Sequence, residues 1–270
     1  MPSPVVESAA PVLRIATFNI QNFGRQKLAK EEIVAQLVRI VRKYDVVAVQ
    51  EISDVTNQVG PSFLAKINAA GGTPYGMVLS ERSGREPANR TSAEQYAFYF
   101  NTATVEKQGD GQLYPDGASD EFEREPFVAG FRARAGGTRF VLITVHTAPE
   151  KSRREIPALG QALAWARARY EGQDGFVILG DFNASGSYAS ASDLARWRAN
   201  ELNYRRIVGD DSDSNVSTAS ARAYDRIVAT DGMAARYGGK HEVDRAFTDA
   251  AVSDHWPVWA EFRMGTDATK

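Results

Sequence analysis

The stretch FVILGDFN, residues 176–183, is the part of the chain that decides the fold. Its first four side chains are apolar and include the β-branched Val177 and Ile178, so the run predicts a short buried strand. The strand ends on Asp181 and Asn183. In layered α/β folds, ligands bind beyond the ends of strands, where loops carry polar side chains out of the core. The stretch therefore predicts a sheet with a functional site at its edge.

Three further apolar runs end on a polar residue in the same way. They are residues 14–18 before Asn19, residues 46–50 before Glu51, and residues 140–145 before His146. The segment SDHWPV, residues 253–258, adds Asp254 and His255 near the C-terminus. Polar groups that recur at strand ends can converge, so we expect these residues to form one site.

Strands outnumber helices in the predicted order of elements, and the helices lie between the strands. We predict helices at 28–43, 63–70 and 153–170, strands on both sides of Gly136-Gly137, and loops at 108–123 and around His241. This order favours two packed sheets flanked by helices over a single parallel sheet. The predicted fold is therefore mixed α/β (α+β), a four-layer αββα sandwich. Without repeats or linkers, residues 12–264 read as one domain between a flexible leader (1–11) and a disordered tail (265–270).

Bulk composition narrows the possible functions. A formal net charge of −2 does not indicate general affinity for nucleic acid, so any DNA contact must come from a local basic patch or a metal ion. The absence of cysteine excludes disulfides, thiolate metal sites and cysteine nucleophiles. No apolar stretch approaches the roughly 18 residues that span a membrane. Residues 1–11 lack the features of a signal peptide, and we expect a mature, secreted or extracytoplasmic monomer.

Five short motifs occur in an order that resembles the endonuclease/exonuclease/phosphatase superfamily, and within it the deoxyribonuclease I group. They are Phe18-Asn19-Ile20, Val49-Gln50-Glu51, Gly180-Asp181-Phe182-Asn183, Tyr224-Asp225-Arg226-Ile227 and Ser253-Asp254-His255-Trp256-Pro257. Matching pieces between them include Arg124-Glu125-Pro126 and His146-Thr147-Ala148-Pro149. Each motif alone is weak, but the ordered set from about residue 13 to 262 is strong, because independent chance matches multiply.

The resemblance implies two histidine–carboxylate pairs at a phosphodiester. His255, oriented by Asp225, would be the general base, and His146, oriented by Glu94, the general acid. A neighbouring carboxylate fixes the tautomer of an imidazole and stabilises its protonated form. The resemblance also places Asp181 and Asn183 at the phosphate or the metal as further catalytic residues.

The same resemblance implies a divalent metal ion. Glu51 would be the main ligand of Mg²⁺ or Mn²⁺, with Asn19 and Asp254 beside it, and these are the oxygen ligands that hard cations prefer. Calcium sites are also a property of the deoxyribonuclease I group. Here Asp116, Asp120 and Glu125 are expected to form a structural Ca²⁺ site in the acidic loop.

The residues that would contact DNA depart in part from the deoxyribonuclease pattern. Arg124, Tyr188 and Asn183 match and are expected to bind substrate. Gln21, Ser53 and Ser92 stand where the group has two arginines and a tyrosine. We hypothesise that the loop with Arg82, Arg85 and Arg90 replaces those contacts by gripping phosphates or entering the minor groove.

The resulting hypothesis is a divalent-metal-dependent endonuclease that cuts double-stranded DNA with little sequence preference and leaves 5′-phosphate ends. The main alternative is a phosphatase or phosphodiesterase of the same superfamily that acts on lipid or inositol phosphates, because fold and site alone do not choose among substrates. An abasic-site nuclease is disfavoured by Tyr224-Asp225-Arg226-Ile227. A catalytically inactive binding protein would be expected to have lost part of the polar set, which is intact. His241 matches no motif and is interpreted as a surface residue.

Overall fold

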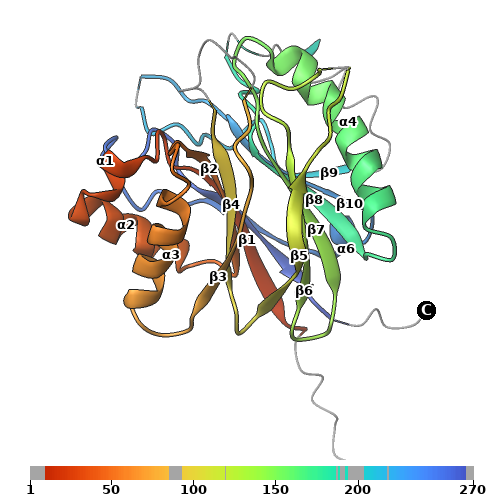
Figure 1. Cartoon of the computed structure of the whole chain (residues 1–270). Coiled ribbons are helices and arrows are strands. Elements are labelled where there is room, and N and C mark those ends of the chain that lie inside the picture. The colour runs from red at the N-terminus through yellow and green to blue at the C-terminus, as the bar shows by residue number, and fades with distance from the viewer. Residues whose placement is uncertain are drawn as a thin grey trace, which may run out of the picture.

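The fold consists of two six-stranded sheets packed face to face, with helices on both outer sides (Figure 1). The computed structural model describes residues 10–84, 93–118, 120–186, 188, 192–193, 204–217 and 219–265. Helices α1, α2 and α3 cover one sheet, and α4 covers the other (Figure 1). The predicted four-layer αββα sandwich is thus confirmed. Nearly all of the predicted leader and tail lie outside the described residues.

The strands of each sheet come from several parts of the chain. Sheet I has the order β11 (Tyr237–Val243), β12 (Val258–Arg263), β1 (Val12–Asn19), β2 (Val46–Ile52), β4 (Gln95–Asn101) and β3 (Tyr75–Leu79). Sheet II has the order β5 (Val105–Leu113), β6 (Phe127–Ala133), β7 (Arg139–His146), β8 (Gly175–Asp181), β10 (Asp225–Thr230) and β9 (Tyr204–Val208). The helices are α1 (Arg25–Leu28), α2 (Glu31–Val41), α3 (Val59–Ala69), α4 (Ser152–Arg169) and α6 (Asp231–Arg236).

Strand direction brings the polar strand ends to one edge of the sandwich. β1 runs parallel to β2, with Asn19 opposite Gln50, and β7 runs parallel to β8, with His146 opposite Asp181. Their neighbours β12, β4 and β10 run antiparallel to them, so these strands begin where the parallel pairs end. Asp225, the first residue of β10, accordingly lies opposite Asp181.

The inward face of these strands changes from apolar to polar at that edge. In β1, Leu13 and Ile15 belong to the core between the sheets, and Asn19, four residues after Ile15, lies on the same face of the strand. In β8, Leu179 lies in this core and Asp181 continues its face. The two-residue period of a strand therefore directs the terminal polar side chains into the space between the sheets.

Aromatic side chains fill the middle of the sandwich. The ring of Phe131 lies 5.5 Å from that of Phe98, edge to face, and 5.8 Å from that of Phe140, stacked. Burial of each such side chain stabilises the fold by about 1.5–3 kcal/mol. A second core lies between sheet I and helices α2 and α3, and a third lies between sheet II and α4. Each sheet therefore packs against the other sheet on its inner face and against helices on its outer face.

The described residues correct the sequence-based prediction at three strands. The predicted loop at 108–123 begins as β5, an edge strand that bulges at Gly109 and Gly111, which have positive φ angles of 84° and 74°. The predicted loop around His241 is β11, an exposed edge strand of sheet I. Strand β9 was not predicted. Edge strands with glycines or two polar faces lack the apolar alternation on which the predictions relied.

Within the described part of the chain, no helix combines the length and apolar character that crossing a membrane requires.

Candidate active site

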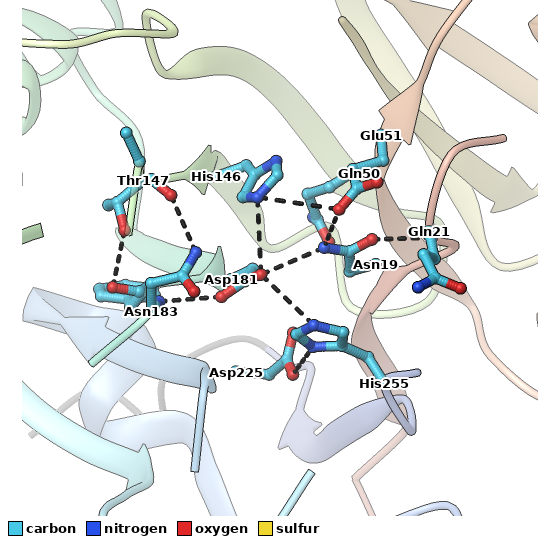
Figure 2. A network of polar contacts seen from close by, with 12 residues as sticks. Asn19, Gln21, Gln50, Glu51, His146, Thr147, Asp181, Asn183, Asp225 and His255 are labelled. Carbon is cyan, nitrogen blue, oxygen red and sulfur yellow. Dashed lines mark hydrogen bonds and ion pairs between the residues drawn. The ribbon is translucent and has the colours of Figure 1, made fainter. Parts of the chain in front are cut away.

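Asp181 lies at the centre of a polar network at the edge of the sandwich (Figure 2). Its Oδ2 accepts a hydrogen bond from Asn19 Nδ2 at 3.1 Å and lies 3.6 Å from Nε2 of both His146 and His255. The two reactive imidazole nitrogens are therefore no further apart than twice this distance. Asp181 Oδ1 accepts from the backbone N–H of Asn183 at 2.8 Å. One buried carboxylate thus connects both histidines.

A close approach of two strands holds Asp181 in place. The preceding Gly180 has φ = +147°, and a Cβ at this residue would lie 2.0 Å from the carbonyl oxygen of Val145. Any larger residue would push β8 away from β7. The glycine therefore keeps Asp181 beside its register partner His146.

Each histidine forms a pair with a carboxylate across the two sheets. His146, at the end of β7 in sheet II, has Nδ1 2.9 Å from Glu94 Oε2, directly before β4 in sheet I. His255, three residues before the start of β12 in sheet I, has Nδ1 2.7 Å from Asp225 Oδ2 in sheet II. All four side chains are buried. The structure brings together both predicted dyads, with Nε2 of each ring directed to Asp181.

Buried groups brace the first dyad from behind. The backbone N–H of His146 donates to the Tyr96 hydroxyl at 3.2 Å, and Arg124 Nε donates to the carbonyl of His146 at 3.1 Å. Arg124 Nη1 also lies 3.6 Å from Glu94 Oε1. Arg124, predicted as a substrate-binding residue, is thus buried and engaged within the protein, where it holds both members of the dyad.

The electrostatics of the site favour protonated imidazoles and an ionised Asp181, whereas burial raises the pKa of Asp225. Burial by itself lowers the pKa of His255, but the Asp225 and Asp181 carboxylates outweigh it and raise the pKa to about 10. Burial and Arg124 lower the pKa of His146, yet Glu94 and Asp181 leave it raised. Burial raises the pKa of Asp181, and the two imidazoles reverse that shift. For either imidazole to act as a base, it must first lose this stabilised proton.

Glu51 stands at the other side of the network. Its backbone has φ = +62°, a left-handed conformation that costs a non-glycine residue of order 1–3 kcal/mol and is found mainly at functional sites. Glu51 Oε1 accepts from Asn19 Nδ2 at 2.8 Å and lies 3.9 Å from His146 Nε2, and Oε2 accepts from the backbone N–H of Asn22 at 2.7 Å. In this conformation the carboxylate faces Asn19 and His146.

Glu51 and Asp254 fit a hard divalent cation. Asp254 Oδ1 is buried without a hydrogen-bond partner and lies 3.9 Å from His255 Nε2. A buried carboxylate oxygen without a hydrogen-bond donor can serve as a ligand of Mg²⁺ or Mn²⁺. Asp181, Asp225 and His255 also bring ligand atoms within 4.8 Å of one another. That group is less suited to Mg²⁺, because an imidazole is a softer ligand and His255 Nδ1 already pairs with Asp225.

Asn19 does not have the orientation of the predicted metal ligand. Its amide nitrogen faces Glu51 and Asp181, and its oxygen accepts from the backbone N–H of Gln21 at 2.8 Å (Figure 2). Asn19 therefore acts as a donor that holds the two carboxylates together. In this orientation the amide oxygen faces Gln21 rather than Glu51, and Asn19 as a metal ligand stays a prediction.

The remaining predicted substrate residues lie on the other side of Asp181. Asn183, in a left-handed conformation with φ = +45°, donates through Nδ2 to the carbonyl of Thr147 at 2.9 Å. The Tyr188 ring lies 6.2 Å from that of Tyr224, which in turn lies 5.6 Å from the ring of His255. A row of rings therefore leads from His255 to Tyr188.

The predicted calcium cage is not formed as a single cluster. Asp116 Oδ2 accepts from the backbone N–H of Phe122 at 2.7 Å, and Glu125 Oε2 accepts from Ser83 Oγ at 2.5 Å. Among the described residues, Asp116, Asp120 and Glu125 do not bring three carboxylates within 4.8 Å of one another. Local hydrogen bonds to the chain thus account for two of the three acidic residues. Arg85 and Arg90, predicted to grip DNA, lie outside the described residues.

Two residues that support the site were missed in the sequence. Glu155 is fully buried and accepts backbone hydrogen bonds from Glu123 at 2.9 Å and Ala148 at 2.8 Å, beside Arg124 and His146. The ammonium group of Lys27 donates to the carbonyls of residues 20, 21 and 252, in the two loops next to Asn19 and Asp254. Both side chains bind backbone atoms. Because every residue has such atoms, the types of the neighbouring residues do not reveal these contacts in the sequence.

Comparisons with known proteins agree with this fold and show the family of the chain. Deoxyribonuclease gamma of Rattus norvegicus is 32% identical over 268 residues, which cover 93% of this chain and 84% of that protein. Deoxyribonuclease-1 of Oryctolagus cuniculus is 31% identical over 276 residues, 94% of each chain. The crystal structure of an endonuclease/exonuclease/phosphatase from Bacteroides vulgatus has the same fold, with a TM-score of 0.66 at 17% identity over 94% of this chain and 99% of that one. The model of the endonuclease/exonuclease/phosphatase family matches residues 16–255, and the chain belongs to this family.

Proposed function

We propose that the protein is a divalent-metal-dependent endonuclease that hydrolyses phosphodiester bonds of double-stranded DNA with low sequence specificity and leaves 5′-phosphate ends. The observation that carries the proposal is the pair of dyads whose Nε2 atoms both lie 3.6 Å from Asp181 Oδ2. The names of the relatives, deoxyribonuclease gamma and deoxyribonuclease-1, support DNA as the substrate.

The two imidazoles serve opposite ends of one displacement. One accepts a proton from the attacking water, whose oxygen bonds to phosphorus. The other donates a proton to the 3′ oxygen as its bond to phosphorus breaks, which yields a 5′-phosphate and a 3′-hydroxyl. His255 is proposed as the base and His146 as the acid. Exchanging these two roles would leave the proton balance of the reaction unchanged. Asp225 and Glu94 keep each Nδ1 hydrogen-bonded, so that Nε2 carries the exchanged proton.

The other polar residues bind and orient the phosphate. Asn183 and Tyr188 are proposed to contact the substrate strand, and Arg124 to act through Glu94 and His146. Glu51 and Asp254 would hold a divalent cation, which would supply positive charge where negative charge develops on the phosphate oxygens. Asn19 keeps Glu51 beside Asp181.

Plasmid nicking tests the proposal. Supercoiled DNA is incubated with wild type, His255→Ala and His146→Ala in Mg²⁺, in Mn²⁺ and in chelator. The matched control is His241→Ala, the third histidine, which is exposed on the edge strand β11. We expect nicking by wild type and His241→Ala with metal, and a loss of at least about 10²-fold in the other two variants. Nicked ends that are ligated without prior phosphorylation demonstrate 5′-phosphates.

Parallel incubations separate the proposal from its alternatives. Single-stranded RNA, sphingomyelin and an inositol polyphosphate are each offered under the same conditions. If the wild type leaves the plasmid intact and releases phosphocholine from sphingomyelin or phosphate from the inositol polyphosphate, the site is that of a phosphatase or phosphodiesterase of the same family, and the DNA proposal is wrong.

A further inference from the structure

Arg222 lies next to the active site but takes no part in the reaction proposed above. It is partly exposed and immediately precedes the segment Ala223-Tyr224-Asp225, which leads into β10. In the part of the chain that the structure describes, its guanidinium forms no ion pair. It donates from Nη1 to the carbonyl of Ala221 at 3.1 Å and hydrogen-bonds the Tyr224 phenol. A guanidinium has five N–H donors, so most of this group's capacity is free for a ligand.

The backbone of Arg222 is tied to the segment that carries His255. Its N–H donates to Asp213 Oδ1 at 2.8 Å, and its carbonyl accepts from Ser214 N–H at 2.9 Å. Ser214 in turn accepts from the N–H of Trp256 at 2.7 Å, next to His255. The position of Arg222 relative to the catalytic dyad is therefore set by backbone hydrogen bonds rather than by a free loop.

The side chain of Arg222 occupies space between two segments that both belong to the site. On one side lies Gly186, three residues after Asn183, where a Cβ would be only 2.9 Å from Arg222 Nε. On the other side lies the Tyr224 phenol, close enough for the guanidinium to counteract the burial that raises its pKa. Since the Tyr224 ring is 5.6 Å from that of His255, the free cation lies just beyond the catalytic histidine.

We propose that Arg222 binds the phosphate that neighbours the scissile one in the substrate strand. The inference rests on the proposed deoxyribonuclease activity and names one contact by which the protein holds the strand. A guanidinium suits this task, because it donates two parallel hydrogen bonds to phosphate oxygens and stays charged at all working pH values. Arg124, in contrast, is buried behind the first dyad and does not have free donors of this kind at the surface.

The test compares Arg222→Gln and Arg222→Lys with wild type on plasmid DNA over a range of salt concentrations. We expect Arg222→Gln to raise KM about tenfold, as the loss of one charge-assisted contact does, with little change in kcat. The slope of log(kcat/KM) against log salt should become shallower by about 1. Arg222→Lys should restore the slope, because its charge is retained, and only part of KM.

A small substrate and a matched control isolate the contact. Bis(p-nitrophenyl) phosphate is a diester without a neighbouring phosphate, so Arg222→Gln should hydrolyse it at the wild-type rate. Arg263→Gln is the control: this exposed arginine lies at the far end of β12, about 17 Å along the strand from its first residue. It should leave KM and the salt slope unchanged. Thermal unfolding of each variant shows whether the fold is intact.

The outcomes separate this inference from the proposed function. Nicking by the wild type with an unchanged KM and salt slope in a folded Arg222→Gln overturns the Arg222 contact alone. An equal loss on bis(p-nitrophenyl) phosphate also overturns it, because Arg222 would then act at the scissile phosphate or through Tyr224. If the wild type does not nick DNA in any metal, the deoxyribonuclease proposal fails and this inference fails with it.

Discussion

Glu155 offers the sharpest test of how the active site is held. This residue lies in the first turn of α4 and has no exposed surface. Each of its carboxylate oxygens accepts one backbone hydrogen bond, Oε1 from Glu123 and Oε2 from Ala148. These two peptide groups lie one residue before Arg124 and two residues after His146. A single buried anion thus joins the two segments that build the first dyad.

The magnitude of its contribution can be worked from these contacts. In Glu155→Gln, the amide oxygen keeps one backbone N–H, and the amide nitrogen faces the other, which loses its acceptor. The loss of one charge-assisted bond and the burial of an unpaired N–H cost about 2–3 kcal/mol in the free energy of unfolding. For a chain of this size that lowers Tm by roughly 4–6 °C. We also expect a lower kcat, because Arg124 and His146 lose their common support.

Urea denaturation at neutral pH and the plasmid assay measure the two effects. Glu150→Gln removes an exposed carboxylate from the same segment and should change neither the free energy of unfolding nor kcat. If Glu155→Gln unfolds within about 0.5 kcal/mol of wild type, the two backbone hydrogen bonds do not contribute as described. A destabilised variant with wild-type kcat would show instead that Glu155 stabilises the fold without positioning the dyad.

Three further predictions concern charge. Burial raises the pKa of Asp54, but hydrogen bonds from Thr56 and two backbone N–H groups at the start of α3 lower it to about 2. A depressed carboxyl pKa stabilises above the unfolded value of about 3.9 and loses its effect as the pH falls to about 2. Asp54→Asn should therefore lower the free energy of unfolding by about 1–2 kcal/mol at pH 7, allowing for solvent screening. In urea denaturation, this difference from wild type should disappear as the pH falls below about 4. His255, with its pKa raised to about 10, stabilises fully below its unfolded value of about 6.5 and progressively less toward pH 10. NMR in chelator should find its ring protonated at pH 8, and a titration midpoint near 6.5 would contradict the site's electrostatics. Chelator should abolish nicking. Glu51→Gln should raise the Mg²⁺ concentration for half-maximal activity at least about tenfold and reduce the Mg²⁺-induced rise in Tm. An unchanged response to Mg²⁺ would exclude Glu51 as a ligand.

The central strands and their polar ends could be predicted because burial of a strand produces a recognisable apolar pattern in the sequence. A strand buried on both faces is a continuous apolar run, and a polar residue at its end stands out, as Asp181 does after residues 176–180. The parallel pairing of β7 with β8 then brings it opposite His146. The ordered motifs added the partners Glu94 and Asp225, which no local pattern links to the histidines.

The remaining features depend on contacts without a local pattern. Strands β5, β9 and β11 lie at or next to the edges of their sheets and carry polar or glycine residues, so their periodicity is weak. Glu155 and Lys27 bind backbone groups that every residue possesses. The Asn19 amide oxygen accepts from the N–H of Gln21, and two of the acidic residues expected to hold calcium, Asp116 and Glu125, accept hydrogen bonds from Phe122 and Ser83. Such outcomes follow from tertiary geometry alone.

Both histidine pairs join one sheet to the other, and this has a consequence for how activity depends on folding. A slip of the two layers by about an ångström would lengthen the short Nδ1–carboxylate contacts of both pairs at once. Neither layer carries a complete pair, so a half-folded chain or a separated fragment has no partial site to work with. Turnover should consequently be lost together with the phenylalanine packing between the layers. The enzymatic rate is therefore a sensitive measure of whether the two sheets are correctly packed against each other.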